Sequence, residues 1–114
     1  MPFINSKVTV KMDDTKKETL KNELGNLISL IPGKSESWLM VGFEDNYSLY
    51  FKGDKKEKAA FVEVKIFGGA DKTSKNNLTA NICDLFEREL QIPKDSIYIT
   101  IQEIDTWGWN GSLF

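Results

Sequence analysis

An internal repeat is the feature of this sequence that most constrains its fold. Three positions recur 61 residues later, as the pairs Leu24 and Leu85, Ile31 and Ile92, and Pro32 and Pro93. A lysine and a serine follow each proline within three residues. Tyr98 stands 60 positions after Trp38, so that both copies carry an aromatic residue at about this point. Self-similarity at a fixed spacing indicates a repeated structural unit. We therefore expect two copies of a strand–helix–strand unit.

The connection inside each copy limits the topology further. Parallel strands need a crossover connection, and a helix supplies it. Right-handed crossovers place both helices on the same side of one sheet. The expected fold class is therefore α/β (α+β), with two β-α-β repeats that form a mixed sheet and two helices on one face. A chain of 114 residues is long enough for one compact domain, so we expect a single domain over residues 1–114.

The first copy is predicted from the spacing of its apolar residues. Alternation predicts a strand over Phe3–Val10, and the helical spacing of leucines and isoleucines predicts a helix over Thr15–Ile31, capped by Asp13 or Asp14. Pro32 and Gly33 end this helix. A second strand is predicted over Trp38–Phe43; it is apolar on both faces, as is typical of a central or interface-covered strand.

The second copy follows a charged connection. Tyr47, Tyr50 and Phe51 indicate a short aromatic strand, and Gly53–Lys58 a hairpin-like loop. The expected elements of the second copy are a strand over Ala60–Phe67, a helix over Thr73–Leu90 and a strand over Ile97–Gln102. The tail Trp107–Gly111 reads as turn-rich and closes on Leu113 and Phe114.

The sheet face opposite the helices is left bare by this topology. It carries Phe61, Phe67, Tyr98 and part of the Trp38–Phe43 strand. Because so much apolar and aromatic surface is unfavourable in water, we expect subunits to pack on this face.

Composition excludes several classes of function. The chain has no histidine, which removes Ser-His and Cys-His nucleophile pairs and histidine metal ligands. A net charge of -2 with interspersed charges argues against nucleic acid or an anionic membrane as partner. Phe61–Val64 has a faint likeness to the core strand of an RNA-recognition module, but the aromatics wanted at Ala59 and Val64 are missing.

Cysteine usage and the chain ends set further expectations. The single Cys83 excludes an intrachain disulfide and a cysteine-rich zinc site, and its apolar neighbours predict a small buried side chain. No stretch resembles a signal peptide or reaches membrane-spanning length. We expect a leaderless protein, cytoplasmic and/or secreted without a signal peptide.

The amino terminus offers one unusual chemical group. Initiator methionine is normally trimmed before a residue as small as Pro2, which would expose a secondary amine with an ordinary pKa of roughly 8. A nearby cation or an apolar pocket lowers that pKa and leaves a neutral base at pH 7. The alternative is a frayed, solvated end.

Other candidate residues have simpler readings beside the functional ones. Lys34 near a helix C-terminus suits a surface residue that complements the helix dipole. Gly68 and Gly69 suit a turn, since they lack the Gly-Lys-Ser/Thr ending of a phosphate-binding loop. The aromatic residues of the tail suit packing or a subunit interface better than ligand stacking; they are Trp107, Trp109 and Phe114.

Motifs spread over nearly the whole chain carry a family resemblance. They are Met1-Pro2-Phe3-Ile4, Gly33-Lys34, Phe67-Gly68-Gly69, Ile97-Tyr98-Ile99 and Trp109-Asn110-Gly111-Ser112-Leu113-Phe114. In order and spacing, the chain resembles the macrophage migration inhibitory factor and D-dopachrome tautomerase family of the tautomerase superfamily. The resemblance implies a homotrimer whose three sheets surround a central channel, with active sites between neighbouring subunits.

The resemblance also assigns roles to residues. It implies that Pro2 is the catalytic base and that Lys34 holds the substrate carboxylate and lowers the pKa of Pro2. Phe67 takes the place of a substrate-contacting isoleucine and is bulkier. Tyr98 comes from the neighbouring subunit, and Thr100 takes the place of an asparagine and is shorter. Both departures bear on substrate preference and rate.

The family's paired cysteines are missing here. Ala59 and Val62 lie near that place, so a thiol–disulfide oxidoreductase role does not carry over.

The expected function is keto–enol tautomerisation of phenylpyruvate-type aromatic α-keto acids, with dopachrome-like substrates as a further class. Neither a cofactor nor a metal is required for it. The alternative is a secreted, cytokine-like ligand for a cell-surface receptor in which the pocket is a remnant.

Overall fold

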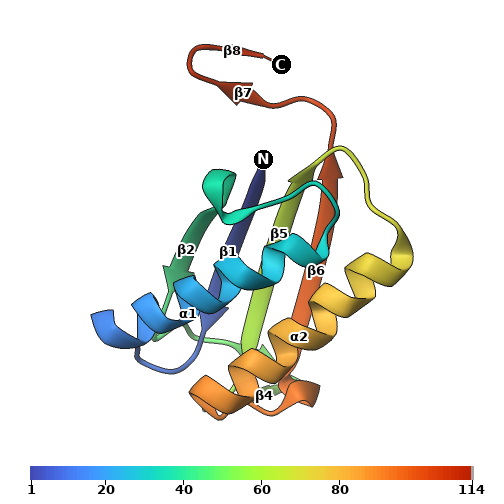
Figure 1. Ribbon diagram of the computed structural model, residues 1–114. Coiled ribbons are helices and arrows are strands. Elements are labelled where there is room, and N and C mark those ends of the chain that lie inside the picture. The colour runs from blue at the N-terminus through green and yellow to red at the C-terminus, as the bar shows by residue number, and fades with distance from the viewer. Residues whose placement is uncertain (114) are drawn as a thin grey trace.

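A four-stranded mixed sheet carries the two long helices on one face (Figure 1). The computed structural model describes residues 1–113. Along the sheet the strands are β2 (Met40–Glu44), β1 (Pro2–Val8), β5 (Ala60–Phe67) and β6 (Ile97–Ile104). Strand β1 is parallel to β2 and β5 is parallel to β6, whereas β1 and β5 are antiparallel. The predicted pair of β-α-β repeats is therefore confirmed.

Both helices begin at an aspartate cap. In α1 (Asp14–Leu27) the carboxylate of Asp13 accepts from the Lys16 amide at 2.8 Å. In α2 (Lys72–Leu90) Asp71 accepts from the Ser74 amide at 2.7 Å. A side chain that accepts from an amide of the first turn satisfies a donor with no partner inside the helix. Of the two predicted caps for the first helix, Asp13 is the one used.

The repeated positions fill one core between the sheet and the helices. Leu24 and Ile31 are fully buried, and so are their counterparts Leu85 and Ile92. The inward-facing residues of the central strands complete the core; they are Ile4, Val8, Val62, Val64 and Ile66. Burial at matching positions explains why the repeat is visible in the sequence at all.

Several predicted boundaries were wrong. Strand β1 begins at Pro2 and ends at Val8, so Val10 lies outside it. The α-helix ends at Leu27 and continues only as the 3-10 turn η1 (Ile28–Leu30). Prediction placed this helix end at Ile31 because the apolar spacing runs on through the 3-10 turn.

The segment around Trp38 is also corrected. Trp38 closes the 3-10 turn η2 (Glu36–Trp38), and pairing with β1 begins only at Met40, opposite Phe3. Strand β2 lies at an edge of the sheet, so the central position is excluded. In the register, Met40 rather than Trp38 corresponds to Tyr98, which lies opposite Phe61.

Two small hairpins lie at opposite ends of the sheet (Figure 1). The strands β3 (Tyr50–Phe51) and β4 (Asp54–Lys55) turn through Lys52 and Gly53, both with positive φ. The strands β7 (Gly108–Trp109) and β8 (Ser112–Leu113) turn through Asn110 and Gly111 in the same way. Two successive positive φ values form the turn that matches strand twist, which accounts for a glycine in each pair. Tyr47 lies outside the short strand, and Phe114 lies outside the described residues.

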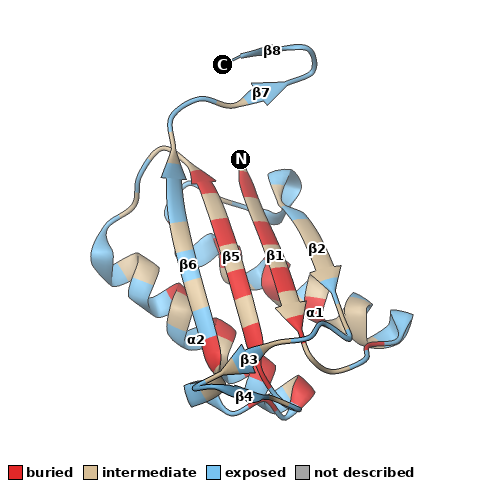
Figure 2. Ribbon diagram, turned by 180° about the vertical axis from the view of Figure 1, so that it is seen from behind, coloured by how far each residue is buried: buried red, intermediate tan, exposed pale blue. Residues whose placement is uncertain are grey.

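The face away from the helices is uncovered, as predicted (Figure 2). Its centre is more polar than the sequence suggested. Lys7 Nζ lies 2.9 Å from Glu63 Oε1, and the Asn5 amide donates to Glu44 at 2.8 Å. The aromatic residues Phe61 and Tyr98 lie at the β3–β4 end of this face. In residues 1–113 neither helix combines the length and low charge that would span a bilayer.

Ser6 places an unfavourable polar group in the core. Its side chain is fully buried, and its hydroxyl has no hydrogen-bond partner in residues 1–113. A buried hydroxyl without a partner costs about 1–3 kcal/mol of desolvation. We expect Ser6→Ala to leave the free energy of unfolding unchanged or to raise it by about 1 kcal/mol in urea denaturation at fixed protein concentration.

Thr9 provides the matched comparison. Its hydroxyl donates to the Glu57 carbonyl at 2.8 Å and accepts from the Ala59 amide at 3.0 Å. Thr9→Val should therefore lower the free energy of unfolding by about 1–2 kcal/mol. Equal losses in the two variants would contradict this assignment of Ser6.

Candidate active site

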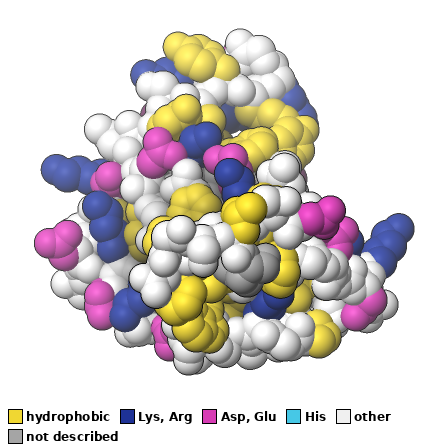
Figure 3. Space-filling view, turned by 90° about the horizontal axis from the view of Figure 1, so that it is seen from above, with side chains coloured by type: hydrophobic (Ala, Val, Ile, Leu, Met, Phe, Trp, Pro, Cys, Tyr) yellow, Lys and Arg dark blue, Asp and Glu magenta, His cyan; other side chains and the backbone are white. Residues whose placement is uncertain are grey.

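A cavity of about 730 Å³ opens at the end of the sheet where the chain begins. Figure 3, which views the molecule from this end, shows hydrophobic side chains gathered there and many charged side chains at the margin. The cavity is mainly apolar, and it is lined by the amino terminus, the η2–β2 segment and the tail. The principal residues are Met1, Pro2, Phe3, Trp38, Met40, Trp107 and Trp109.

Pro2 is held at the base of this cavity by the sheet. It is buried and pairs with Ile66 on β5, and the Met1 carbonyl accepts from the Phe67 amide at 3.0 Å. The first residue of a strand suits proline, because the missing N–H interrupts no inner pair. The frayed, solvated terminus is therefore excluded.

Lys34 reaches the end of β5, next to the start of β1, from the turn after η1; it does not itself line the cavity. Its backbone amide donates to the Ile31 carbonyl at 3.1 Å, which closes the turn. Its Nζ donates to the carbonyl of Phe67 at 2.8 Å, and the side chain is only partly exposed. A lysine that only complemented a helix dipole would bond to carbonyls of its own helix. Lys34 instead fixes its charge beside the start of β1.

The charge of Lys34 acts on the terminal amine. In the untrimmed chain, burial first and then the Lys34 ammonium lower the pKa of the Met1 amine below its ordinary value of 8.0. Both causes disfavour the protonated form. An amine at this position is therefore more often neutral at pH 7 than a solvated one.

The five predicted site residues fall into two groups. Pro2, Lys34 and Phe67 lie together at the β7–β8 end of the sheet. Tyr98 lies opposite Phe61, five residues along β5 from Ile66, or about 16 Å at the usual rise of a strand. Thr100 lies opposite Glu63, between the two ends. A single chain therefore does not bring Tyr98 or Thr100 to Pro2.

Tyr98 has its own surroundings at the far end. Tyr98 is 58% exposed, and its ring meets Phe51 of the β3–β4 hairpin edge to face, with centroids 5.2 Å apart. A smaller pocket behind the ring is lined by Tyr50, Ala60 and Phe61, among others. The exposed ring is free to contact another molecule.

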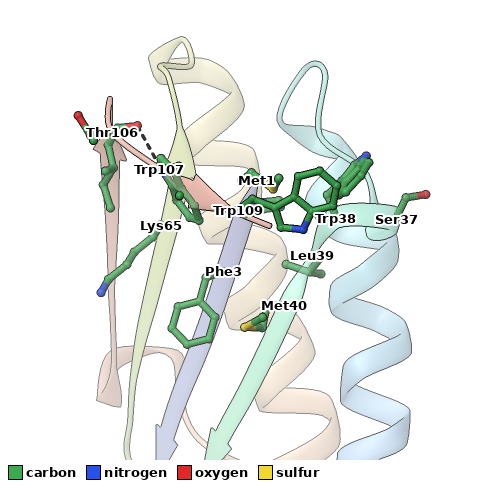
Figure 4. A pocket seen from close by; sticks show the side chains of 13 residues that line it. Met1, Phe3, Ser37, Trp38, Leu39, Met40, Lys65, Thr106, Trp107 and Trp109 are labelled. Atoms are coloured by element: carbon green, nitrogen blue, oxygen red, sulfur yellow. Dashed lines mark hydrogen bonds between the residues drawn. The ribbon is translucent and has the colours of Figure 1, made fainter. Parts of the chain in front are cut away.

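Two tryptophans form a cavity wall that sequence reasoning missed. Trp38 and Trp109 contact edge to face with centroids 5.3 Å apart, and both are about half exposed (Figure 4). Trp107 also lines the cavity, and its indole N–H donates to the Ile104 carbonyl at 3.1 Å. Trp107 and Trp109 thus line the cavity and also make contacts within the chain, and the expectation that they serve packing or an interface rather than ligand stacking stays a prediction. The available signal was the Trp-Gly-Trp sequence in a turn-rich tail.

Metal binding and thiol chemistry have little support in the described residues. In residues 1–113 no group of three or more acidic or cysteine side chains is arranged to hold a metal ion. Cys83 is partly buried against the core, and burial raises the pKa of its thiol, which disfavours the reactive thiolate.

The pair of β-α-β repeats on one mixed sheet is the fold of the tautomerase superfamily, to which solved structures similar to this chain belong. The family model for macrophage migration inhibitory factor (MIF) matches residues 1–114. The chain therefore belongs to the macrophage migration inhibitory factor family.

Relatives agree along the full length. A homologue of the factor from Trichinella spiralis is 29% identical over 100% of both chains. The crystal structure of MIF2 from Leishmania major is 30% identical, with a TM-score of 0.90 over 100% of this chain and 97% of that one. A homologue from Prochlorococcus marinus is 30% identical, with a TM-score of 0.86 and 98% of both chains covered. Membership supports an isomerase of the tautomerase type.

The link between Lys34 and the terminal amine can be tested directly. Lys34→Met removes the positive charge, so the pKa of the Met1 amine in the untrimmed chain should rise towards its ordinary value. The rise should be only partial, because burial is the larger cause of the lowered pKa. The measurement is the pH dependence of amine labelling, followed by mass spectrometry. Lys21→Met on the exposed face of α1 is the control, and a rise of equal size there would refute the link.

Proposed function

We propose that this protein is a keto–enol tautomerase for phenylpyruvate-type aromatic α-keto acids, with dopachrome-like compounds as further substrates. The base is the amine of Pro2 after removal of Met1. One observation carries the proposal: the Lys34 ammonium is fixed on the Phe67 carbonyl, close to the start of β1, where the buried Pro2 lines an apolar cavity.

The proton transfer follows from these groups. The neutral nitrogen of Pro2 takes a proton from the carbon beside the substrate carbonyl, and the C–H electron pair forms the double bond of an enolate. The protonated proline then returns the proton to the oxygen and releases the enol. Only a proton moves, so the expected independence from cofactors stays part of the proposal.

Lys34 and the tryptophans orient the substrate in this scheme. An ammonium has three donors, and Lys34 uses one on the Phe67 carbonyl, which leaves donors for the substrate carboxylate. Trp38 and Trp109 offer aromatic surface to the substrate ring. Held at both ends, the substrate presents its acidic carbon to Pro2. Phe67, bulkier than the family's isoleucine, is expected to narrow the choice of substrates.

Protein neighbours of the same fold are consistent with this chemistry. One, 14% identical with a TM-score of 0.84, was crystallised after inactivation by 2-oxo-3-pentynoate, itself an α-keto acid. Another, a fused protein 14% identical with a TM-score of 0.85, is an asymmetric trimer. At this identity the likeness concerns the fold, so substrate and assembly enter here only as proposals.

Removal of the base is the first test. Pro2→Gly keeps a terminal amine but replaces the secondary amine with a primary, more mobile one. We expect kcat/KM for phenylpyruvate to fall by about 100-fold or more, because a positioned base contributes that much. Mass spectrometry must show that Met1 is absent from both proteins. Equal rates in trimmed wild type and trimmed Pro2→Gly would refute the role of Pro2.

A homotrimer would unite the two groups of site residues. The bare sheet face, with Phe61 and Tyr98 exposed to different degrees at one end, supports packing of subunits there. In the proposed assembly Tyr98 and Thr100 of one subunit complete the cavity at Pro2 of the next. Sedimentation at working concentration should give the mass of three chains, and a monomer would contradict the assembly.

Mixed assemblies test the shared site more sharply. Pro2→Gly and Tyr98→Ala chains should each be nearly inactive alone. When the two are unfolded together and refolded, random trimers should recover about one quarter of wild-type activity, since that share of sites combines an intact Pro2 with an intact Tyr98 from its neighbour. No recovery in trimers of verified mixed composition would refute the supply of Tyr98 by the neighbouring subunit, and full activity of Tyr98→Ala alone would place Tyr98 outside the site.

The alternative is a secreted, cytokine-like ligand for a cell-surface receptor, and family membership is the observation that favours it. Trimmed Pro2→Gly separates the two functions, because its folded surface is nearly unchanged. A migration response of receptor-bearing cells that persists with this variant would support the receptor role. Absence of binding to responsive cells would count against it.

A further inference from the structure

We propose that Glu103 is a positioning residue that clamps the loop Gly68–Ala70 after β5, and that it thereby holds the end of β5 at Phe67 and the Lys34 ammonium bound there. The catalytic consequence of this clamp rests on the proposed function. The clamp itself rests on contacts at the end of β6, outside the cavity lining.

The carboxylate of Glu103 joins three elements. Its Oε2 accepts from the backbone amide of Ala70 at 2.8 Å, in the loop that follows β5. Its Oε1 lies 3.3 Å from Lys75 Nζ on the first turns of α2. The next residue, Ile104, accepts from the Gly68 amide through its carbonyl at 3.2 Å. Two hydrogen bonds therefore attach the loop to β6: one to the Glu103 side chain and one to the Ile104 backbone.

Gly69 shows that the carboxylate needs a close approach to the loop. A Cβ built at Gly69 would lie 2.6 Å from Glu103 Oε2, far inside van der Waals contact. Any larger residue at position 69 would therefore push the carboxylate away from Ala70. The absence of a side chain at this position is a condition for the clamp.

The loop passes its position on to the site through Phe67. The Phe67 carbonyl is the acceptor for Lys34 Nζ, and the Phe67 amide donates to the Met1 carbonyl. A shift of the Phe67 backbone would therefore move both the acceptor of Lys34 and the donor to Met1. Glu103 touches neither, so its effect on substrate is indirect.

The charge state of Glu103 suits this role. The Ala70 amide first, and then Lys75, lower the pKa of the carboxyl below its ordinary value. The carboxylate is therefore ionised at neutral pH, and hydrogen bonds to an ionised acceptor are the stronger kind.

The test compares Glu103→Ala with Glu103→Gln. The glutamine keeps an oxygen for the Ala70 amide, whereas the alanine leaves none. We expect hydrogen exchange of the Ala70 amide to accelerate about tenfold or more in Glu103→Ala and to stay near wild type in Glu103→Gln. With phenylpyruvate, KM should rise about fivefold in Glu103→Ala with a smaller change in kcat. The reason is that Lys34, which binds the substrate carboxylate, is displaced, whereas the base Pro2 is retained.

Glu89→Ala is the matched control. Glu89 forms an ion pair with Lys16, also at 3.3 Å, at the other end of α2. Its loss should cost stability without altering exchange at Ala70 or the KM. Equal effects in Glu89→Ala and Glu103→Ala would reduce Glu103 to a general stabilising residue and overturn the proposal.

Gly69→Ala approaches the same contact from the loop side. If it acts by displacing the carboxylate, its effects on Ala70 exchange and on KM should not add to those of Glu103→Ala in the double variant. Full additivity would overturn the clamp.

The outcomes separate this proposal from the proposed function. If wild-type protein does not turn over phenylpyruvate, the function fails, and the clamp is then judged by Ala70 exchange and by the pKa of the terminal amine. That pKa should rise in Glu103→Ala as Lys34 moves away. Unchanged exchange together with an unchanged amine pKa would overturn the clamp.

Discussion

The rest of the structure depends on the insertion of the first strand between two others. Strand β1 is hydrogen-bonded along both edges, to β2 on one side and to β5 on the other. A terminal strand in a central position cannot fray without opening the whole sheet. The amino terminus therefore becomes a fixed point of the fold. The cavity, the lysine turn and the loop after β5 are all positioned against it.

Local patterns made much of this fold predictable. The aspartate caps, the spacing of buried leucines and isoleucines and the alternation over Ala60–Phe67 each record burial within one element. Strand order and helix ends depend on pairing between distant segments. For that reason the edge position of β2 and the 3-10 turn at Trp38 were not visible, since an apolar run looks the same at a centre, at an edge or in a turn.

The site was predictable to the extent that single residues define it. Pro2 could be singled out because a terminal secondary amine is an unusual group, whereas Lys34 and Phe67 were named only through the family resemblance. Their meeting follows from topology, since β1 and β5 are neighbours. The wall of Trp38 and Trp109 joins two segments through the fold of the tail, and no sequence pattern records that contact. The role of Glu103 is equally invisible, because an exposed glutamate on a strand end looks like ordinary surface.

The antiparallel junction of β1 and β5 gives the chain an approximate two-fold axis. Pro2 faces Ile66 and Val8 faces Ala60, so a half-turn about the middle of this pair exchanges Pro2 with Ala60 and Phe3 with Phe61. The small pocket of about 90 Å³ beside Ala60 is thus the symmetry mate of the large cavity. The nitrogen of Ala60 belongs to a peptide bond and cannot titrate. The nitrogen of Pro2 is likewise in a peptide bond while Met1 is present, so under the proposed function the two halves come to differ chemically only when that one bond is removed.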